Sequence, residues 1–301
     1  MQNCHPIALF TYNRLHHLKR TINSLLTNEL ANSSDLYVFS DGYQGLHDQQ
    51  AVEEVRSFLN NIEGFQRVEI CERPRNYGLS RNVISGVNTV LSKHQAVIVL
   101  EDDLYLSSSF LTVMNNLLDR YQSNTQIGSV SGYRYPFSVP DEWPDFFMLP
   151  RASSWGWGTW SDRWDEVDWD VKDYQEFIKN SDQKKKFNSG GNDLVPMLVK
   201  WKLGLNDSWA IRWAYYHYKM NKYCLFPKYN LVENIGNDGS GTHSPKSIKY
   251  SNVVYDSQSI EYPDRPEVHE ELVRSLQRFF GLTVIRKLIN LVILNLKSIG
   301  R

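Results

Sequence analysis

The amino-acid sequence predicts an α/β protein with a doubly wound, mostly parallel sheet. Up to about residue 105, short aliphatic runs alternate with segments whose apolar residues recur at helical spacing. The run at residues 97–100 contains only Val, Ile and Leu, as expected for a strand that is buried on both faces of a parallel sheet. It ends in three consecutive carboxylates, Glu101, Asp102 and Asp103. Because open α/β sheets bind ligands beyond the carboxyl ends of their strands, these acids are predicted to face a binding site.

The elements of this first part follow from the hydrophobic pattern. Each strand is a short apolar run that stops at polar residues or Gly, and each helix has apolar residues three and four positions apart. We expect strands at residues 6–11, 36–39, 67–70 and 97–100, with helices at 15–26, 52–59 and 80–91. With right-handed crossovers, the strand ends share one edge of the sheet. Beside the acidic triplet, this edge is predicted to collect Asn13, Arg14, Asp41, Asn76 and Arg81.

The middle of the chain has a different character. A helix at 109–120 and a strand at 127–132 continue the alternation. Residues 136–160 are rich in Pro, Trp and Phe and show no clear periodicity, which predicts irregular structure that faces a ligand. Trp and Tyr crowd between residues 143 and 229, and such rings suit both sugar-binding surfaces and ordinary cores.

The last part of the chain is basic and amphipathic. Residues 272–301 contain no Asp or Glu, and their Leu, Ile and Val residues recur at helical spacing among six Lys and Arg residues. Such a helix can lie on an anionic membrane surface. It can equally pack on the body of the protein or on a second subunit, and both alternatives stay open.

Composition narrows the class of protein. A net charge of -1 gives no general attraction to nucleic acid, so no nucleic-acid partner is expected. Cys4, Cys71 and Cys224 are widely spaced, without the pattern of a zinc site or a disulfide framework. The first residues do not follow the secretory pattern, and no apolar stretch is long enough for a confident membrane span. A cytoplasmic protein is therefore expected.

Several polar residues are candidates for binding a ligand. Asp41 can accept hydrogen bonds from a base imide or a ribose hydroxyl, although Asp before Gly is also a common turn pair. Arg75, Asn76 and Arg81 can meet a diphosphate near a helix start, or they can be solvated surface residues. His243 lies in a Gly-rich loop, where imidazole can bind a divalent ion or a phosphate oxygen; a surface His is the alternative.

Asp207 is the preferred candidate for a general base. It precedes a predicted helix that carries Trp209 and Trp213 on one face, and a carboxylate among aromatic side chains suits proton abstraction. The alternative is a plain helix N-cap. Rivals for the same role follow the Gly-Trp-Gly segment directly: Asp162, Asp165 and Glu166.

Taken together and in this order, the motifs resemble nucleotide-sugar-dependent glycosyltransferases of the GT-A fold, in the family-2-like group that includes bacterial surface-glycan enzymes. The resemblance spans residues 5–245. It is carried by Thr11-Tyr12-Asn13-Arg14, Phe39-Ser40-Asp41-Gly42, Asn76-Tyr77-Gly78-Leu79-Ser80-Arg81-Asn82 and Glu101-Asp102-Asp103. The triplet resembles the Asp-x-Asp signature in the Glu-Asp-Asp variant of N-acetylglucosaminyltransferase I. Trp155-Gly156-Trp157 and Asp207-Ser208-Trp209 are similar to the acceptor half of bacterial members.

The resemblance implies a role for each residue. Asp103 would hold a divalent metal, Mn or Mg, with His243 as a further candidate ligand, while Glu101 and Asp102 would orient the ribose and the donor sugar. Asp207 would take the proton of the acceptor hydroxyl. The donor site would also include Thr11, Asn13, Arg14, Asp41, Asn76 and Arg81, and the acceptor site Trp155, Trp157 and Trp209.

The implied protein is a GT-A domain in which residues 1–132 bind the nucleotide sugar and residues 133–270 bind the acceptor, followed by an amphipathic helix at 271–301. It would transfer a sugar, with inversion, from a nucleoside-diphosphate sugar to a hydroxyl of a glycan or lipid-linked glycan, in bacterial lipopolysaccharide or capsule synthesis. It would act in the cytoplasm, with its last helix on the inner face of the plasma membrane or in a homodimer. Two alternatives stay open: a sugar nucleotidyltransferase and a non-catalytic glycan-binding protein.

Overall fold

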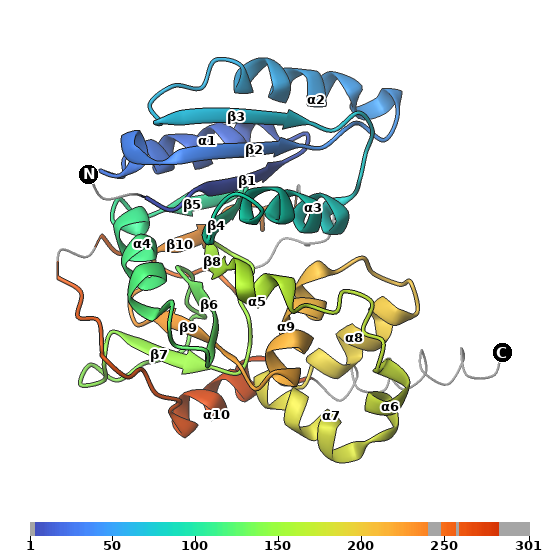
Figure 1. Ribbon diagram of the computed structural model, residues 1–301, viewed down its shortest axis with the longest axis vertical. Coiled ribbons are helices and arrows are strands. Elements are labelled where there is room, and N and C mark those ends of the chain that lie inside the picture. Colours follow the sequence, from blue (N-terminus) through green and yellow to red (C-terminus); the bar gives the residue numbers. More distant parts are fainter. Residues whose placement is uncertain (1–3, 240–247, 257–258, 283–301) are drawn as a thin grey trace.

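The computed structural model describes residues 4–239, 248–256 and 259–282. Its main sheet has the strand order β3-β2-β1-β4-β8-β6-β9-β7 (Figure 1). The first half of this sheet is parallel and consists of β1 (Ile7–Thr11), β2 (Asp35–Ser40), β3 (Arg67–Glu72) and β4 (Ala96–Glu101). The strands predicted from the hydrophobic pattern are therefore confirmed, and they pair as expected.

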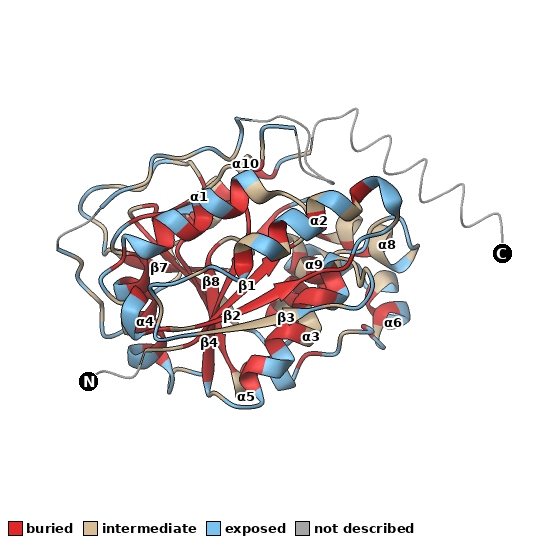
Figure 2. Ribbon diagram, turned by 90° about the horizontal axis from the view of Figure 1, so that it is seen from above, coloured by how far each residue is buried: buried red, intermediate tan, exposed pale blue. Residues whose placement is uncertain are grey.

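Helices cover both faces of the parallel half. Alternate residues of β1 point to opposite sides, with Ile7 and Leu9 in one hydrophobic cluster and Ala8 and Phe10 in another. The first cluster includes residues of α1 (Leu15–Leu26), α2 (Leu46–Leu59) and α4 (Phe110–Tyr121), and the second includes residues of α3 (Leu79–Leu91). Seen from above, α1 and α2 lie on one side of the sheet and α3 on the other (Figure 2). The predicted doubly wound arrangement is confirmed.

The second half of the sheet is mixed. It contains β6 (Ile127–Ser131), β7 (Phe146–Leu149), β8 (Trp157–Trp160) and β9 (Tyr223–Pro227). Strand β8 runs antiparallel to both β4 and β6, and β7 runs antiparallel to β9. The prediction of irregular structure throughout residues 136–160 is therefore wrong for β7 and β8. Every residue of these two strands is buried, so neither shows the alternation of polar and apolar side chains that marks a half-exposed strand.

A group of helices lies beside the mixed half of the sheet. They are α5 (Ser161–Asp165), α6 (Tyr174–Lys179), α7 (Ser181–Phe187), α8 (Leu194–Lys202) and α9 (Trp209–Lys219), with a short 3₁₀ turn at η2 (Asn188–Gly190). A second 3₁₀ turn, η1 (Ala31–Ser33), connects α1 to β2 in the parallel half. Helix α9 belongs to two clusters, because Trp209 and Trp213 pack toward α3 while Ile211 and Tyr215 pack toward α6 to α8. It therefore joins the helical group to the sheet.

A small antiparallel ribbon lies next to the acidic triplet. It pairs β5 (Leu104–Leu106) with β10 (Val232–Asn234), and it brings the segment after β10 alongside β4. Helix α10 (Glu270–Phe279) follows later in the chain and opens the predicted C-terminal helical region. The rest of that region, residues 283–301, lies outside the described residues. No helix in the described part of the chain is both long and apolar enough to cross a bilayer.

Candidate active site

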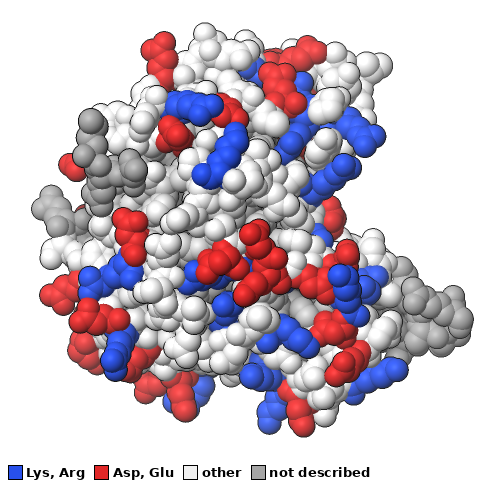
Figure 3. All heavy atoms as spheres, viewed as in Figure 1, with Lys and Arg blue, Asp and Glu red and all other residues white. Residues whose placement is uncertain are grey.

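A cavity of about 300 Å³ lies at the carboxyl ends of β1, β2 and β4. The outline of the molecule is notched on the side toward which β2 and β3 run (Figure 3). The second half of the chain contributes Trp155, Asp207, Asn234 and Gly236 to the cavity wall. Of the residues predicted from the sequence, the cavity brings together Thr11, Asn13, Arg14, Asp41, Asn76, Glu101, Asp102, Asp103, Trp155 and Asp207.

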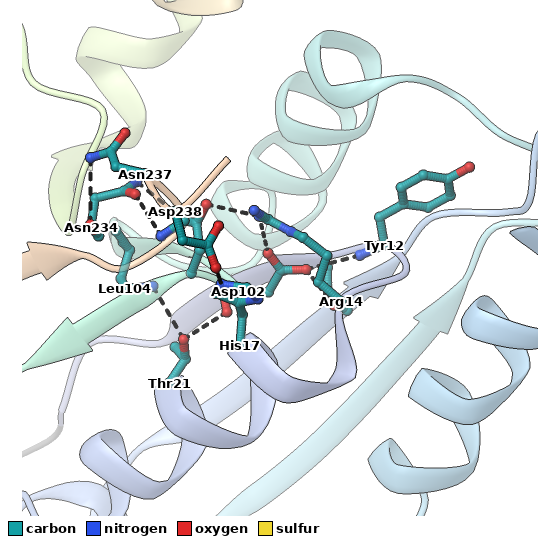
Figure 4. A network of polar contacts seen from close by, with 12 residues as sticks. Tyr12, Arg14, His17, Thr21, Asp102, Leu104, Asn234, Asn237 and Asp238 are labelled. Atoms are coloured by element: carbon teal, nitrogen blue, oxygen red, sulfur yellow. Dashed lines mark hydrogen bonds and ion pairs between the residues drawn. The ribbon is translucent and has the colours of Figure 1, made fainter. Parts of the chain in front are cut away.

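Asp102 lines the cavity and is only 3% exposed. Its Oδ2 accepts hydrogen bonds from Thr11 Oγ1 at 2.9 Å and from the Tyr12 amide at 3.2 Å. A terminal nitrogen of Arg14 donates to Asp102 Oδ1 at 2.6 Å and to Asp103 Oδ2 at 2.8 Å (Figure 4). These bonds fix the loop that follows β1 against the acidic triplet.

The segment after β10 closes over Asp103. The side-chain amide of Asn234 donates to Asp103 Oδ1 at 3.4 Å, and the Ile235 amide donates to the Asp103 carbonyl oxygen at 2.8 Å. Gly236 packs so closely that a Cβ atom there would lie 2.2 Å from Asp103 Oδ2 and 2.9 Å from a terminal nitrogen of Arg14. A side chain at this position would therefore force the Asp103 carboxylate, the Arg14 guanidinium or the segment itself to shift.

The carboxylates of the acidic cluster are buried and repel one another, and Arg14 does not fully neutralise their charge. Desolvation, together with the charges of Asp103 and Asp102, raises the pKa of Glu101 to about 8. Desolvation and the charge of Asp102 also raise the pKa of Asp103. Burial alone would lower the pKa of Arg14, but Asp102 and Asp103 outweigh that effect and raise it above its ordinary value. The cluster thus favours more positive charge than Arg14 supplies.

The oxygen donors of this cluster fit a hard divalent cation, which prefers carboxylates, phosphates and water as ligands. Within the described residues, no group of three or more His, Cys, Asp or Glu side chains is arranged to hold a metal ion by itself. A preformed cage is not required, because Mg²⁺ is commonly bound by one or two carboxylates and by the phosphates of a substrate. The chemistry of the site therefore fits a cation that arrives with a diphosphate.

Asp41 organises the other side of the cavity and is 4% exposed. Its Oδ1 accepts from the amides of Gly42 at 2.9 Å and Tyr77 at 2.7 Å, and its Oδ2 accepts from the amide of Gly78 at 3.0 Å. Gly78, at φ +74°, occupies the left-handed region just before α3, where a side chain would be strained. Asn76 donates to the Gly42 carbonyl oxygen at 2.8 Å. Asp41 therefore holds the loop before α3 in place while it also lines the cavity.

Asp207 enters the cavity wall from the start of α9. The N-cap of this helix is Ser208, whose hydroxyl accepts from the Ile211 amide at 3.2 Å, so Asp207 is not the cap. Its side chain is 65% exposed and lies 4.0 Å from the guanidinium of Arg212. The aromatic enclosure expected from the sequence is absent. The three rival carboxylates do not line the cavity: Asp162, Asp165 and Glu166.

The tryptophans divide into two groups. Trp157 and Trp209 are 0% and 3% exposed, and their rings stack with centroids 5.2 Å apart. Both belong to the core beneath α3 and α9, and neither lines the cavity, so the expectation that they present their faces to an acceptor is not met. Trp155 is partly buried and does line the cavity. It keeps its candidate role.

Two arginines that were candidates from the sequence lie outside the cavity wall. Arg81 is exposed, with its guanidinium 4.4 Å from the centre of the Tyr77 ring, and it is not part of the cavity wall. Arg75 is exposed as well and does not line the cavity. His243 lies outside the described residues.

Sequence reasoning missed part of the wall. Asn234 and Gly236 reach the cavity because β10 pairs with β5, and that pairing joins segments more than a hundred residues apart. No local pattern reveals such a pairing. Other wall residues were given no role of their own: Tyr12, Gln44, Leu79 and Asn82. Tyr12, Leu79 and Asn82 belong to motifs quoted from the sequence, and Gln44 follows Phe39-Ser40-Asp41-Gly42 closely, so their positions were the available signal.

A comparison with models of known protein families finds a match to one family. The model of "Glycosyl transferase family 2" matches residues 7–181, which is more than half of the chain. A comparison with curated proteins finds no significant match. Among solved structures, S. aureus TarS is 13% identical, with a TM-score of 0.37, over 55% of this chain and 30% of that chain. A TarS structure of residues 1–349 is 12% identical, with a TM-score of 0.34, over 52% and 47%.

A third structure is a mannosyltransferase, PcManGT from Pyrobaculum calidifontis in complex with GDP-Man and Mn2+. It is 11% identical, with a TM-score of 0.33, over 52% of this chain and 44% of that chain. In each of these three comparisons the match spans less than half of the other protein's chain. The family match covers the parallel half of the sheet, the acidic triplet and β8. The chain belongs to glycosyl transferase family 2, and its α/β fold is of the GT-A type.

Proposed function

We propose that the protein transfers a sugar from a nucleoside-diphosphate sugar to a hydroxyl group of a glycan or lipid-linked glycan, with a divalent cation and with inversion of the anomeric carbon. One observation carries the proposal: the acidic triplet, Asp41 and Asp207 line a single cavity at the carboxyl edge of the sheet. Family membership supports the transfer of a sugar, so a sugar nucleotidyltransferase and a non-catalytic glycan-binding protein are not retained.

The donor would bind with its nucleoside toward Thr11, Asn13 and Asp41 and its diphosphate toward the acidic cluster. Support comes from the buried hydrogen bonds that fix this side of the cavity before any ligand enters. A rigid wall of this kind lowers the entropic cost of binding. Asn76 and Arg14 line the same space and can donate to ribose or phosphate oxygens.

Asp103 would hold the cation, Mn or Mg. We assign Asp102 to the cation as well, in place of the ribose or sugar contact expected from the sequence, because its Oδ1 and Asp103 Oδ2 share one Arg14 nitrogen as hydrogen-bond donor and the cluster is short of positive charge. When bound, such a cation acts as a Lewis acid that stabilises the charge developing on the leaving diphosphate. Arg14 would stabilise the same charge through its guanidinium. Glu101 would contact the donor ribose or sugar, since its side chain faces the cavity from the end of β4.

Asp207 would act as general base. It is the cavity-lining carboxylate supplied by the helical half of the molecule, and its exposed side chain can receive the proton of an incoming hydroxyl. A single carboxylate that lines the same cavity as the acidic cluster suits one direct displacement, which inverts the anomeric configuration. Trp155, in the same wall, would offer an apolar surface to an acceptor sugar ring.

A role in bacterial surface polysaccharide synthesis, lipopolysaccharide or capsule, is the biological setting that we propose for this reaction. A location on the inner face of the plasma membrane, or a homodimer, would depend on the basic segment at the end of the chain. That segment carries Arg286, Lys287, Lys297 and Arg301 without a single acid. Liposome flotation that is unchanged after deletion of residues 283–301 would contradict the membrane location.

A donor screen tests the proposed reaction. Purified protein is incubated with UDP-, GDP- and dTDP-sugars, with and without Mn²⁺, and release of the nucleoside diphosphate is measured. We expect release from one donor class, in the presence of the cation, and loss of that release in Asp103→Asn. The matched control is Asp165→Asn, an exposed carboxylate outside the cavity, which should leave release unchanged. Release that is independent of Mn²⁺ and of Asp103 would contradict the proposal.

A further inference from the structure

The Arg14 guanidinium lies between the two carboxylates that would hold the cation. One terminal nitrogen donates at 2.6 Å to Asp102 Oδ1 and at 2.8 Å to Asp103 Oδ2, so both oxygens point at the same atom. The three side chains are 21%, 4% and 10% exposed. A divalent ion bound by the same two oxygens, at the usual distance of about 2.0–2.6 Å, would have to occupy the space that this nitrogen fills.

The remaining partners of the two carboxylates are neutral. Asp102 Oδ2 accepts from Thr11 Oγ1 and from the Tyr12 amide, and Asp103 Oδ1 faces the side-chain amide of Asn234. The nearby His17 has its ring Nε2 3.2 Å from a carboxylate oxygen of Asp238 (Figure 4). Arg14 is therefore the permanent cation in direct contact with these carboxylates in the described structure.

The guanidinium can leave without the loop moving. The backbone of the loop is tied to Asp102 through the Tyr12 amide, and α1 begins directly after Arg14. Gly236 lies close to the guanidinium, since a Cβ atom there would be 2.9 Å from its other terminal nitrogen, and as a glycine it places no side chain over Arg14. Rotation of the Arg14 side chain into the cavity that it lines is thus enough to free both carboxylate oxygens.

We propose that Arg14 is an internal counter-ion that competes with the divalent cation for Asp102 and Asp103 until a nucleoside diphosphate draws its guanidinium away. A diphosphate offers Arg14 a bidentate anionic partner, so the carboxylates become available when the cation's second set of ligands arrives. The inference rests on the proposed donor site. It follows that binding of the divalent cation and binding of the nucleoside diphosphate are coupled. Each of these two ligands raises the affinity of the protein for the other by the same factor.

The test measures Mn²⁺ binding, with free Mn²⁺ followed by electron paramagnetic resonance, in wild-type protein and in Arg14→Met. Without nucleotide, we expect Arg14→Met to bind Mn²⁺ about tenfold more tightly than wild-type protein. With saturating Mn²⁺, we expect the same variant to bind the nucleoside diphosphate (UDP, GDP or dTDP, each in turn) more weakly than wild-type protein. A merely structural role would weaken both, so the opposite signs are the signature.

Two further variants complete the design. Arg14→Lys keeps the charge but donates from a single ammonium, and we expect its Mn²⁺ affinity to lie between those of wild-type protein and Arg14→Met. Arg67→Gln removes the same charge at the first residue of β3, in an exposed ion pair with Glu69, and should leave Mn²⁺ affinity unchanged. Thermal unfolding of all variants establishes that each is folded.

The experiment distinguishes a failure of the counter-ion role from a failure of the proposed donor site. If wild-type protein binds Mn²⁺ in the presence of a nucleoside diphosphate, but Arg14→Met shows equal or weaker affinity for Mn²⁺ alone, the counter-ion role is overturned while the donor site stands. If wild-type protein binds neither Mn²⁺ nor any of the three nucleotides, the donor site itself is overturned, and the inference falls with it.

Discussion

Asp103 and Asp207 are carboxylates of the same cavity with opposite surroundings. Asp103 is buried, is held by Arg14 and contacts Asn234, whereas Asp207 is 65% exposed and lies 4.0 Å from Arg212. Burial among other acids suits a ligand for a cation, and exposure to an incoming hydroxyl suits a proton acceptor. The two residues should therefore fail in different ways when they are changed.

Asp103→Ala is expected to abolish transfer because the cation is no longer held. Asp207→Asn is expected to lower the transfer rate by about 10²- to 10⁴-fold, the usual contribution of a general base, with the affinity for the nucleoside diphosphate retained. Calorimetric titration with Mn²⁺ and nucleotide, next to a transfer assay, measures both quantities. Equal loss of nucleotide affinity in the two variants would contradict the division of roles.

Gly236 is the second residue whose substitution is informative. Its missing Cβ makes room for Asp103 Oδ2, which would otherwise lie 2.2 Å away. Gly236→Ala should push the segment after β10 off the acidic cluster and weaken nucleotide binding by about tenfold, a cost of about 1.4 kcal/mol. Because Gly236 is buried, we expect the melting temperature to fall as well, and thermal unfolding is measured beside the titration. Unchanged nucleotide affinity would show that the loop does not shape the donor site.

Helix α9 places Asp207, and its start depends on a single cap. Ser208 Oγ accepts from the Ile211 amide at 3.2 Å. Ser208→Ala removes this acceptor and should lower the free energy of unfolding by about 1 kcal/mol, while Ser208→Asn should restore most of it. Urea unfolding compares the three proteins. Transfer activity should follow the same order, since Asp207 is the residue before the cap. Full activity in an unstable Ser208→Ala would mean that the cap does not position Asp207.

The other end of α9 contains a buried histidine that couples stability to pH. His217 Nδ1 donates to the Trp213 carbonyl oxygen, and Nε2 accepts from the Ser129 hydroxyl, both at 3.0 Å. Burial lowers the pKa of His217 from 6.5 to about 4. Between these two values the unfolded chain binds more protons than the folded chain, so the free energy of unfolding falls as the pH falls.

For this reason we expect the contribution of His217 to decrease by about 2 kcal/mol between pH 7 and pH 5. Urea unfolding at the two pH values measures the change in wild-type protein and in His217→Gln. The variant has no imidazole to protonate and should lose that much less stability over the same interval. Equal losses in the two proteins would contradict the buried, neutral state of His217.

Across the whole molecule, the site exists because two halves of the chain meet at one edge of a sheet. The parallel half supplies the acids and Asp41, and the second half supplies Asp207, Trp155 and the segment after β10. The parallel half was predictable, because its strands and helices are encoded in local hydrophobic periodicity and because strand ends gather at one edge. The position of the acidic triplet followed from the same argument.

The rest depends on contacts that no local pattern reveals. Strand β8 joins β4 to β6 in an antiparallel pairing that only the folded chain defines. Composition does not distinguish a tryptophan that stacks on a ligand from one that stacks on another tryptophan. Trp157 and Trp209 therefore looked like binding residues, although they lie in the core. The approach of Gly236 to Asp103 likewise depends on the β5–β10 ribbon.

The decisive experiment is a crystal soaked with Mn²⁺ and a nucleoside diphosphate, with data collected at a wavelength where manganese scatters anomalously. We expect an anomalous peak within coordination distance of Asp103, with the diphosphate beside it and the Arg14 guanidinium turned toward the phosphates. Nucleotide density in the cavity with no anomalous peak at the acidic cluster, or a peak bound elsewhere, would contradict the proposed donor site.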